Sequence, residues 1–106
     1  MIDPGQLTTR LTLEAPVDSD DGQGGVTRSY AAQAVLWAQL APHPARDHVT
    51  ADDARAVQRV TITLRGGLAL SRAHRFSDGP RTYRIVSWRA RERGAWLEID
   101  TESELT

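Results

Sequence analysis

The chain has 106 residues, enough for one domain with a single modest core and too few for two. Its 40% hydrophobic and 25% charged residues are ordinary for a soluble globular protein, and the absence of cysteine excludes disulfides and thiol catalysis. The formal net charge is −1, and no apolar run approaches the roughly 20 residues of a membrane span. Because the N-terminus also lacks the order of a signal peptide, we expect a protein that folds in a cytoplasm.

All 13 basic residues are arginine. The planar, rigid guanidinium group suits carboxylate and phosphate partners, so the bias could reflect protein interfaces or nucleic acid. Alanine is also abundant, however, and the codon usage of a GC-rich genome explains both features more simply.

The first 42 residues predict three strands. In residues 7–16, Leu11 and Leu13 share a face, Arg10 and Thr12 lie on the other, and a proline ends the segment. Residues 25–32 and 33–42 follow as two further strands. The second of these is apolar enough on both faces to predict a central strand of the sheet.

The stretch DSDDGQGG, residues 18–25, places three aspartates and three glycines between the first two strands. A calcium loop of the EF-hand kind needs an oxygen ligand at position five, glycine at six and glutamate at twelve, where this chain has Gly22, Gln23 and Ser29. A phosphate loop would be followed by Lys-Ser or Lys-Thr, and clustered aspartates repel an anion. We therefore expect a solvated loop and no metal or other cofactor.

The pattern changes between Pro42 and Ala56, where Thr50 and Asp53 resemble a helix capping box ahead of an alanine-rich run. The sequence predicts a loop here that enters one short helix. His43 and His48 are five positions apart, a spacing that places them on neither one helix face nor one strand face, so no metal site is predicted.

The second half predicts three more strands. Residues 59–65 alternate most clearly, with Val60, Ile62 and Leu64 facing inward. An Asp-Gly-Pro turn at residues 78–80 starts a hairpin, and Gly94 turns the chain into the last strand. In the strand after the first turn, the two faces are expected to carry Tyr83, Ile85 and Ser87 on one side and Arg84, Val86 and Trp88 on the other.

Short strands with local connections favour a mainly β fold, since an open sheet of such strands would expose its edges. We predict a small six-stranded antiparallel β-barrel with one short helical insertion, forming a single domain over residues 1–106. No catalytic site is predicted, because paired carboxylates occur only at residues 20–21 and 52–53, where solvated aspartates make poor general acids. No serine has the context of a nucleophile elbow.

Three arginines in residues 89–93 would line one side of a ribbon beside Trp88 and Trp96, an arrangement that can bind a nucleic-acid strand. Acidic residues of the segment 98–104 lie just across the hairpin and could instead pair with them strand to strand. We favour a solvated or interface-forming face, and a small β-barrel nucleic-acid-binding module is the alternative.

In their order and spacing these segments resemble the head-tail connector proteins, the head-closure or stopper group, of long-tailed double-stranded DNA phages and gene transfer agents. The resemblance covers nearly the whole chain and is carried by DPGQLTTRLTLEAPV (residues 3–17), DGQGGVTRSY (21–30), VLWAQLAP (35–42), RVTITLR (59–65) and TYRIVSW (82–88). The chain departs from the family pattern at residues 43–49, HPARDHV, where relatives often carry Gly-x-Glu.

The resemblance implies a structural virion protein, with neither enzymatic activity nor a membrane partner. It implies a hexameric or dodecameric ring in the head-tail neck, assembled in the bacterial cytoplasm. The ring would join the portal or adaptor to a tail terminator or tail tube, and would help retain packaged double-stranded DNA that it contacts non-specifically in its channel. An adaptor or a tail terminator of the same particle remains open.

Three groups of residues are the expected contact surfaces. The candidate assembly loop consists of Asp18, Asp20, Asp21, Gly22, Gln23, Gly24 and Gly25. The candidate interface or channel insertion consists of Arg46, Asp47, His48, Asp52, Asp53 and Arg55. The candidate interface arginines are Arg81, Arg89, Arg91 and Arg93.

Overall fold

The computed structural model describes residues 4–43 and 56–105. After a short 3-10 helix, η1 (Pro4–Gln6), the described chain consists of the strands β1 (Thr9–Asp20), β2 (Val26–Pro42), β3 (Ala56–Arg65), β4 (Arg75–Ser77), β5 (Thr82–Arg91) and β6 (Trp96–Leu105). The predicted mainly β class with six antiparallel strands is confirmed. The short helix predicted ahead of Ala56 falls in residues 44–55, which lie outside the described residues.

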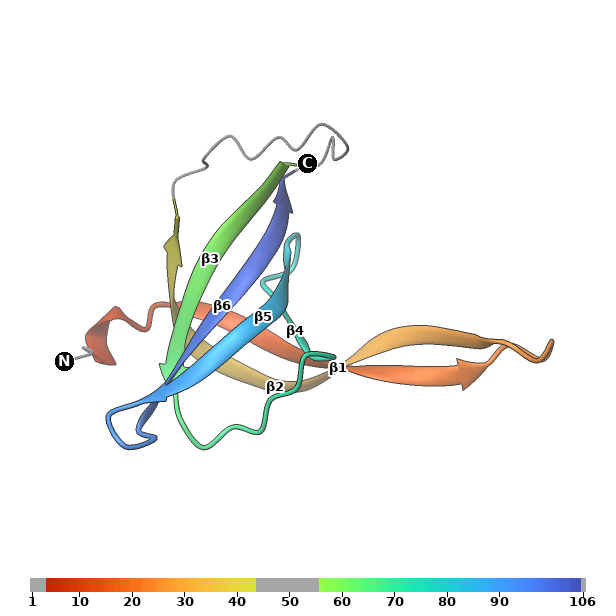
Figure 1. The fold of residues 1–106 in the computed structure, drawn as a ribbon, viewed down its shortest axis with the longest axis horizontal. Helices are drawn as coiled ribbons and strands as arrows, with labels where there is room; N and C mark the ends of the chain where they lie inside the picture. Colours follow the sequence, from red (N-terminus) through yellow and green to blue (C-terminus); the bar gives the residue numbers. More distant parts are fainter. Residues whose placement is uncertain (1–3, 44–55, 106) are drawn as a thin grey trace.

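The six strands close into a ring in the order β1-β2-β3-β6-β5-β4 (Figure 1). The three residues of β4 complete the ring, since they pair with Thr12–Glu14 of β1 on one side and with Thr82–Arg84 of β5 on the other. A closed sheet leaves no free edge along the paired segments, so the body avoids the exposed edges that an open sheet of these strands would have.

The core fills the inside of this ring. In β3, Val60, Ile62 and Leu64 are each at most 2% exposed, as their alternation with polar residues predicted. The other strands contribute their inward positions in the same way. The fully buried hydrophobic side chains from these strands include Leu11, Leu13, Phe76, Ile85 and Ile99.

Strand β2 differs from its prediction in two respects. It is one continuous strand, Val26–Pro42, where two strands were predicted. The strand is also buried on one face only. Ala38 on the inner face is fully buried, whereas Val35 and Trp37 on the outer face are 58% and 55% exposed. The Arg10 guanidinium lies 5.6 Å from the centre of the Trp37 ring and covers part of that outer face.

A β-bulge in β5 overturns the predicted faces of that strand. The register with β6 shifts between Ile85 and Ser87, so that Ser87 pairs with Asp100 and Trp88 pairs with the buried Ile99. The extra residue, Val86, exchanges the two faces of every later position. The grouping of Ser87 with Tyr83 and Ile85 is therefore wrong beyond the bulge.

Candidate functional site

The β1–β2 hairpin projects from the closed body as a two-stranded arm, residues 15–31 (Figure 1). β4 reaches β1 only as far as Glu14, and β3 reaches β2 only from Ala38 onward. Within the described parts of the chain, the two strands of the arm therefore pair only with each other. Both outer edges of this ribbon present unpaired backbone groups, the usual starting point for strand addition by another chain.

A second β-bulge marks the base of the arm. Leu13 pairs with Ala34 but Glu14 pairs with Ala32, which leaves Gln33 as the extra residue of β2. A bulge bends a strand and increases its twist, which turns the hairpin out of the ring. The side chain of Gln33 is also held, because His74 Nε2 lies 3.0 Å from its Oε1.

The two faces of the arm carry different chemistry, because alternate residues of a strand point to opposite sides. One face has only short, uncharged side chains, those of Ala15, Val17, Ser19, Thr27, Ser29 and Ala31. On the other face Arg28 Nε donates to Asp18 Oδ1 at 2.8 Å. That hydrogen bond lowers the pKa of Asp18 and raises the pKa of Arg28.

Aspartate side chains order the tip of the arm, residues 21–25. Asp21 Oδ1 accepts hydrogen bonds from the backbone N–H groups of Gln23 at 2.7 Å and Gly25 at 3.0 Å. Asp20 Oδ1 accepts one from the N–H of Gly22 at 2.9 Å. Such local bonds are the reason that aspartate favours turns, and they leave both carboxylates exposed at the end of the arm.

The tip is shorter than the loop that the sequence predicted. Asp18 and Asp20 belong to β1, and the irregular part begins at Asp21. Gly22 and Gly24 have φ values of 78° and 81°, a region in which a side chain is strained. Among the residues that the structure describes, no group of three or more His, Cys, Asp or Glu side chains could hold a metal ion.

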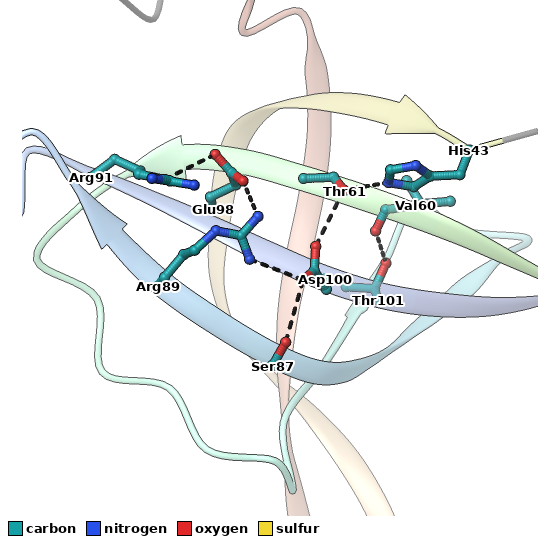
Figure 2. Close-up of polar contacts among 9 residues, drawn as sticks. All are labelled: His43, Val60, Thr61, Ser87, Arg89, Arg91, Glu98, Asp100 and Thr101. Atoms are coloured by element: carbon teal, nitrogen blue, oxygen red, sulfur yellow. Dashed lines mark hydrogen bonds and ion pairs between the residues drawn. The ribbon is translucent and has the colours of Figure 1, made fainter.

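A ladder of ion pairs crosses the outer face of β5 and β6 (Figure 2). Arg89 contacts both Glu98 and Asp100, the latter at 3.0 Å, and Arg91 Nε lies 3.4 Å from Glu98. Further along the strands, Arg84 pairs with Glu102. The cross-strand pairing predicted from the acidic C-terminal segment is therefore confirmed.

Asp100 is the centre of a wider polar network in this ladder. Besides Arg89, it accepts hydrogen bonds from Thr61 at 3.3 Å and Ser87 at 3.4 Å, and His43 Nε2 lies 2.7 Å from Thr61 Oγ1 (Figure 2). Partial burial alone would raise the pKa of Asp100. The hydrogen bonds and charge of Arg89, with the two hydroxyl groups, outweigh this effect and lower the pKa.

Of the two aromatic side chains expected beside these arginines, Trp96 is buried, and Trp88, although 38% exposed, lies on the other face of the sheet from Arg89. Trp96 is 7% exposed and packs under Arg65, whose guanidinium lies 5.6 Å from its ring centre. Trp88 pairs with Ile99, one position away from the Arg89–Glu98 pair, and therefore lies on the opposite face of the sheet from Arg89. Arginines that are already ion-paired and lack stacking partners give little support to the nucleic-acid alternative.

The four predicted interface arginines do not form one surface. Arg81 follows the β4–β5 turn, where its backbone N–H donates to Asp78 Oδ1 at 2.9 Å. Arg93 lies beyond the other end of β5, in the turn to β6, with a φ of 57°. The predicted insertion residues Arg46, Asp47, His48, Asp52, Asp53 and Arg55 lie outside the described residues.

A groove of about 560 Å³ at the base of the arm was missed by sequence reasoning. Four arginines line it, Arg28, Arg72, Arg75 and Arg84, together with His74 and Tyr30. These residues come from β2, the segment before β4, β4 itself and β5, so no local pattern signals the groove. We call it the arginine groove.

The described residues thus form a closed β body with a projecting arm and several ion pairs on its outer face. No helix among the described residues is long and apolar enough to cross a membrane. The chain belongs to the phage head completion protein family, whose model matches residues 2–104.

Comparison with solved structures gives a related result. The chain is similar to one in the "Virion of native gene transfer agent (GTA) particle", with a TM-score of 0.76 and 26% sequence identity, over 92% of this chain and 94% of that one. No curated protein matches the chain. Family membership confirms the expected class, a structural protein of phage-like particles rather than an enzyme.

Proposed function

We propose that this protein forms a ring in the neck of a phage or gene transfer agent particle, where it joins the portal or adaptor to the tail and helps retain packaged DNA. Membership of the head completion family and similarity to a chain of a gene transfer agent virion support this assignment. A hexamer or dodecamer is expected, because closed symmetry satisfies a repeated interface without leaving a free surface.

The observation that carries the proposal is the arm. All residues from Val17 to Gly24 are exposed, so they add nothing to the core. An isolated two-stranded ribbon is at best marginally stable in water. Val17 and Val26 are 43% and 69% exposed on this ribbon, and covering each by a partner would contribute up to about 1.5–3 kcal/mol.

Shortening the arm tests the proposal. Replacement of residues 18–28 by Asn-Gly leaves Val17 opposite Ser29, the register that a tight hairpin requires. The variant should fold, because every core side chain is retained. In particle-producing cells we expect filled heads that fail to join tails and lose DNA, counted by electron microscopy.

The matched control is Glu92→Asn in the β5–β6 turn, where asparagine suits the positive φ of 51° and particle yield should stay unchanged. Unfolding of the shortened variant, seen by circular dichroism, would make the arm a structural element and remove the support for its assembly role. Normal yields of infectious or transfer-competent particles from a folded variant would refute the role directly.

The ring itself is tested by native mass spectrometry of the protein alone and with the adaptor. Higher assembly is expected at least in the presence of the adaptor, which would act as a template. A monomer in finished particles would contradict the proposal.

A further inference from the structure

We propose that the acidic tip of the arm, Asp20 and Asp21, binds in the arginine groove of the neighbouring copy. The inference rests on the proposed ring and specifies its contact: a head-to-tail interface in which each copy gives its arm to one neighbour and receives the arm of the other. Such heterologous contacts generate closed rings when the rotation closes.

The arginine groove has hydrogen-bond donors to spare. Arg28 donates two N–H groups to Asp18, Arg75 donates one to Glu14 at 2.7 Å and stacks on Tyr30, and Arg84 contacts Glu102. A guanidinium has five N–H donors, so each of these arginines can serve a second acceptor.

Arg72 gives the groove its surplus charge. Its side chain is exposed and makes no ion pair with any described residue. The other three arginines are each balanced by one carboxylate, so among the described residues the groove carries one positive charge without a counter-charge. This charge is available to a carboxylate from another chain.

A buried hydroxyl group in the same groove also lacks a partner. Ser103 is 1% exposed, lines the groove, and its Oγ makes no hydrogen bond within the described part of the chain. Most buried polar side-chain atoms do have a partner, and an ordered water is the usual partner of a hydroxyl group such as this one, so Ser103 adds polarity to the groove but does not itself identify the occupant.

The acidic tip has complementary chemistry. Asp20 and Asp21 each use one carboxylate oxygen to hold the turn, and the second oxygen of each accepts no hydrogen bond among the described residues. Because the turn is already ordered, docking it costs little conformational entropy.

The tip cannot fill the groove of its own copy. Arg75 lies at the base of the arm, opposite Glu14, six residues along β1 from Asp20. At about 3.3 Å per residue this separation is roughly 20 Å, and the strand that spans it is held extended by its pairing with β2. A carboxylate at the Arg75 end of the groove must therefore come from a second copy, whereas Arg28 at the other end lies on the arm itself and already pairs with Asp18.

Charge reversal tests the contact. Asp20→Arg and Arg72→Asp should each lower the fraction of heads joined to tails at least tenfold. The double variant should recover most of this fraction, because an arginine at position 20 can then pair with an aspartate at position 72. Asp20→Asn keeps the turn-forming oxygen but removes the charge, and should show an intermediate loss. Glu92→Arg, an equal charge change in the β5–β6 turn far from the groove, should have no effect.

Cross-linking locates the contact, since the chain has no native cysteine. An affinity-tagged Asp20→Cys chain co-expressed with an untagged Arg72→Cys chain should give a mixed disulfide dimer once the released particles are treated with an added thiol oxidant, because the cytoplasm itself keeps thiols reduced. A Glu92→Cys chain in place of the Arg72→Cys chain should not.

Different failures have different meanings. If wild-type particles show rings but both reversals assemble normally, or the double variant fails to recover, the groove contact is wrong and the ring stands. If Arg72→Asp leaves the ring intact and only weakens retention of DNA, the groove binds phosphate and the contact is also wrong. If wild-type particles contain no ring, the proposed function itself fails.

Discussion

Gly66 shows how one missing methyl group decides the packing between the end of β3 and the β5–β6 turn. Its N–H donates to the carbonyl of Ala95 at 2.9 Å, and a Cβ at this position would lie 1.9 Å from the carbonyl oxygen of Gly94. Both contacts are to backbone, which cannot move aside as a side chain can.

Gly66→Ala should therefore destabilise the protein by about 1–3 kcal/mol, the usual cost of overpacking. The matched control is Gly25→Ala, whose Cβ would meet only the carboxylate end of Asp21, at 2.5 Å, on the exposed tip. It should change the free energy of unfolding by less than about 0.5 kcal/mol in urea titrations. Equal effects of the two substitutions would contradict this account.

Asp100 gives the stability of the fold a dependence on acid pH. Its pKa in the folded protein is lowered from the ordinary value of an aspartate, so its contribution to stability is fully present above that ordinary value and is lost as the pH falls through the lowered folded pKa. Asp100→Asn should cost less than about 1 kcal/mol at neutral pH, because the carboxylate is 41% exposed and screened by solvent.

The difference between Asp100→Asn and wild type should shrink toward zero in urea titrations repeated at about pH 2. Glu92→Gln, in the exposed turn, is the control and should show no such difference at either pH. A difference that persists at the acid pH would assign the effect of Asp100→Asn to packing rather than charge.

At the scale of elements, the three-residue strand β4 has a role out of proportion to its length. It joins β1 to β5 and so completes the ring, and its central residue, Phe76, is fully buried. Phe76→Ala should destabilise the protein by about 3–5 kcal/mol.

Val35→Ala, at a position 58% exposed on β2, should change stability by less than about 0.5 kcal/mol and serves as the control. Thermal and urea unfolding of both variants test the comparison. A loss below about 1 kcal/mol for Phe76→Ala would mean that the ring stays closed without this anchor.

The elements differ in how far the sequence could predict them. β3 was predicted well, because its alternation is unbroken and its inward residues are all aliphatic. The faces of β5 could not be predicted beyond Val86, since a bulge changes the alternation without any local signal in residue type. The continuity of β2 was missed for a related reason: the bulge at Gln33 resembles a break between two strands.

The candidate contact surfaces also differ in how far the sequence could predict them. The composition of residues 18–25 indicated a solvated loop, because Asp and Gly favour turns whatever their surroundings; this holds for residues 21–25, whereas Asp18 and Asp20 belong to β1. The length of the arm depends on where β3 and β4 stop pairing, and the arginine groove depends on four segments meeting, so tertiary structure alone decides both.

At the scale of the whole molecule, the arm makes the chain elongated. The radius of gyration is 15.5 Å and the principal extents are 51 × 36 × 23 Å. A compact domain of this length would have a radius near 13 Å.

The variant with residues 18–28 replaced by Asn-Gly should therefore approach about 13 Å in small-angle scattering of the monomer. Wild type measured at the same concentration is the reference. An unchanged radius would show that the arm does not project in solution.

The two strands of the arm are continuous with strands of the core. β1 runs without interruption from Leu11 and Leu13 in the core to Asp20 near the tip, and β2 returns in the same way to Ala38. An irregular loop under tension would first extend. The two strands of the arm are already extended, so a force applied at the tip is transmitted along both backbones to the core. If a neighbour binds the arm as proposed, it is connected directly to the hydrophobic core, and tension in the assembled particle would be borne by strands rather than by linkers.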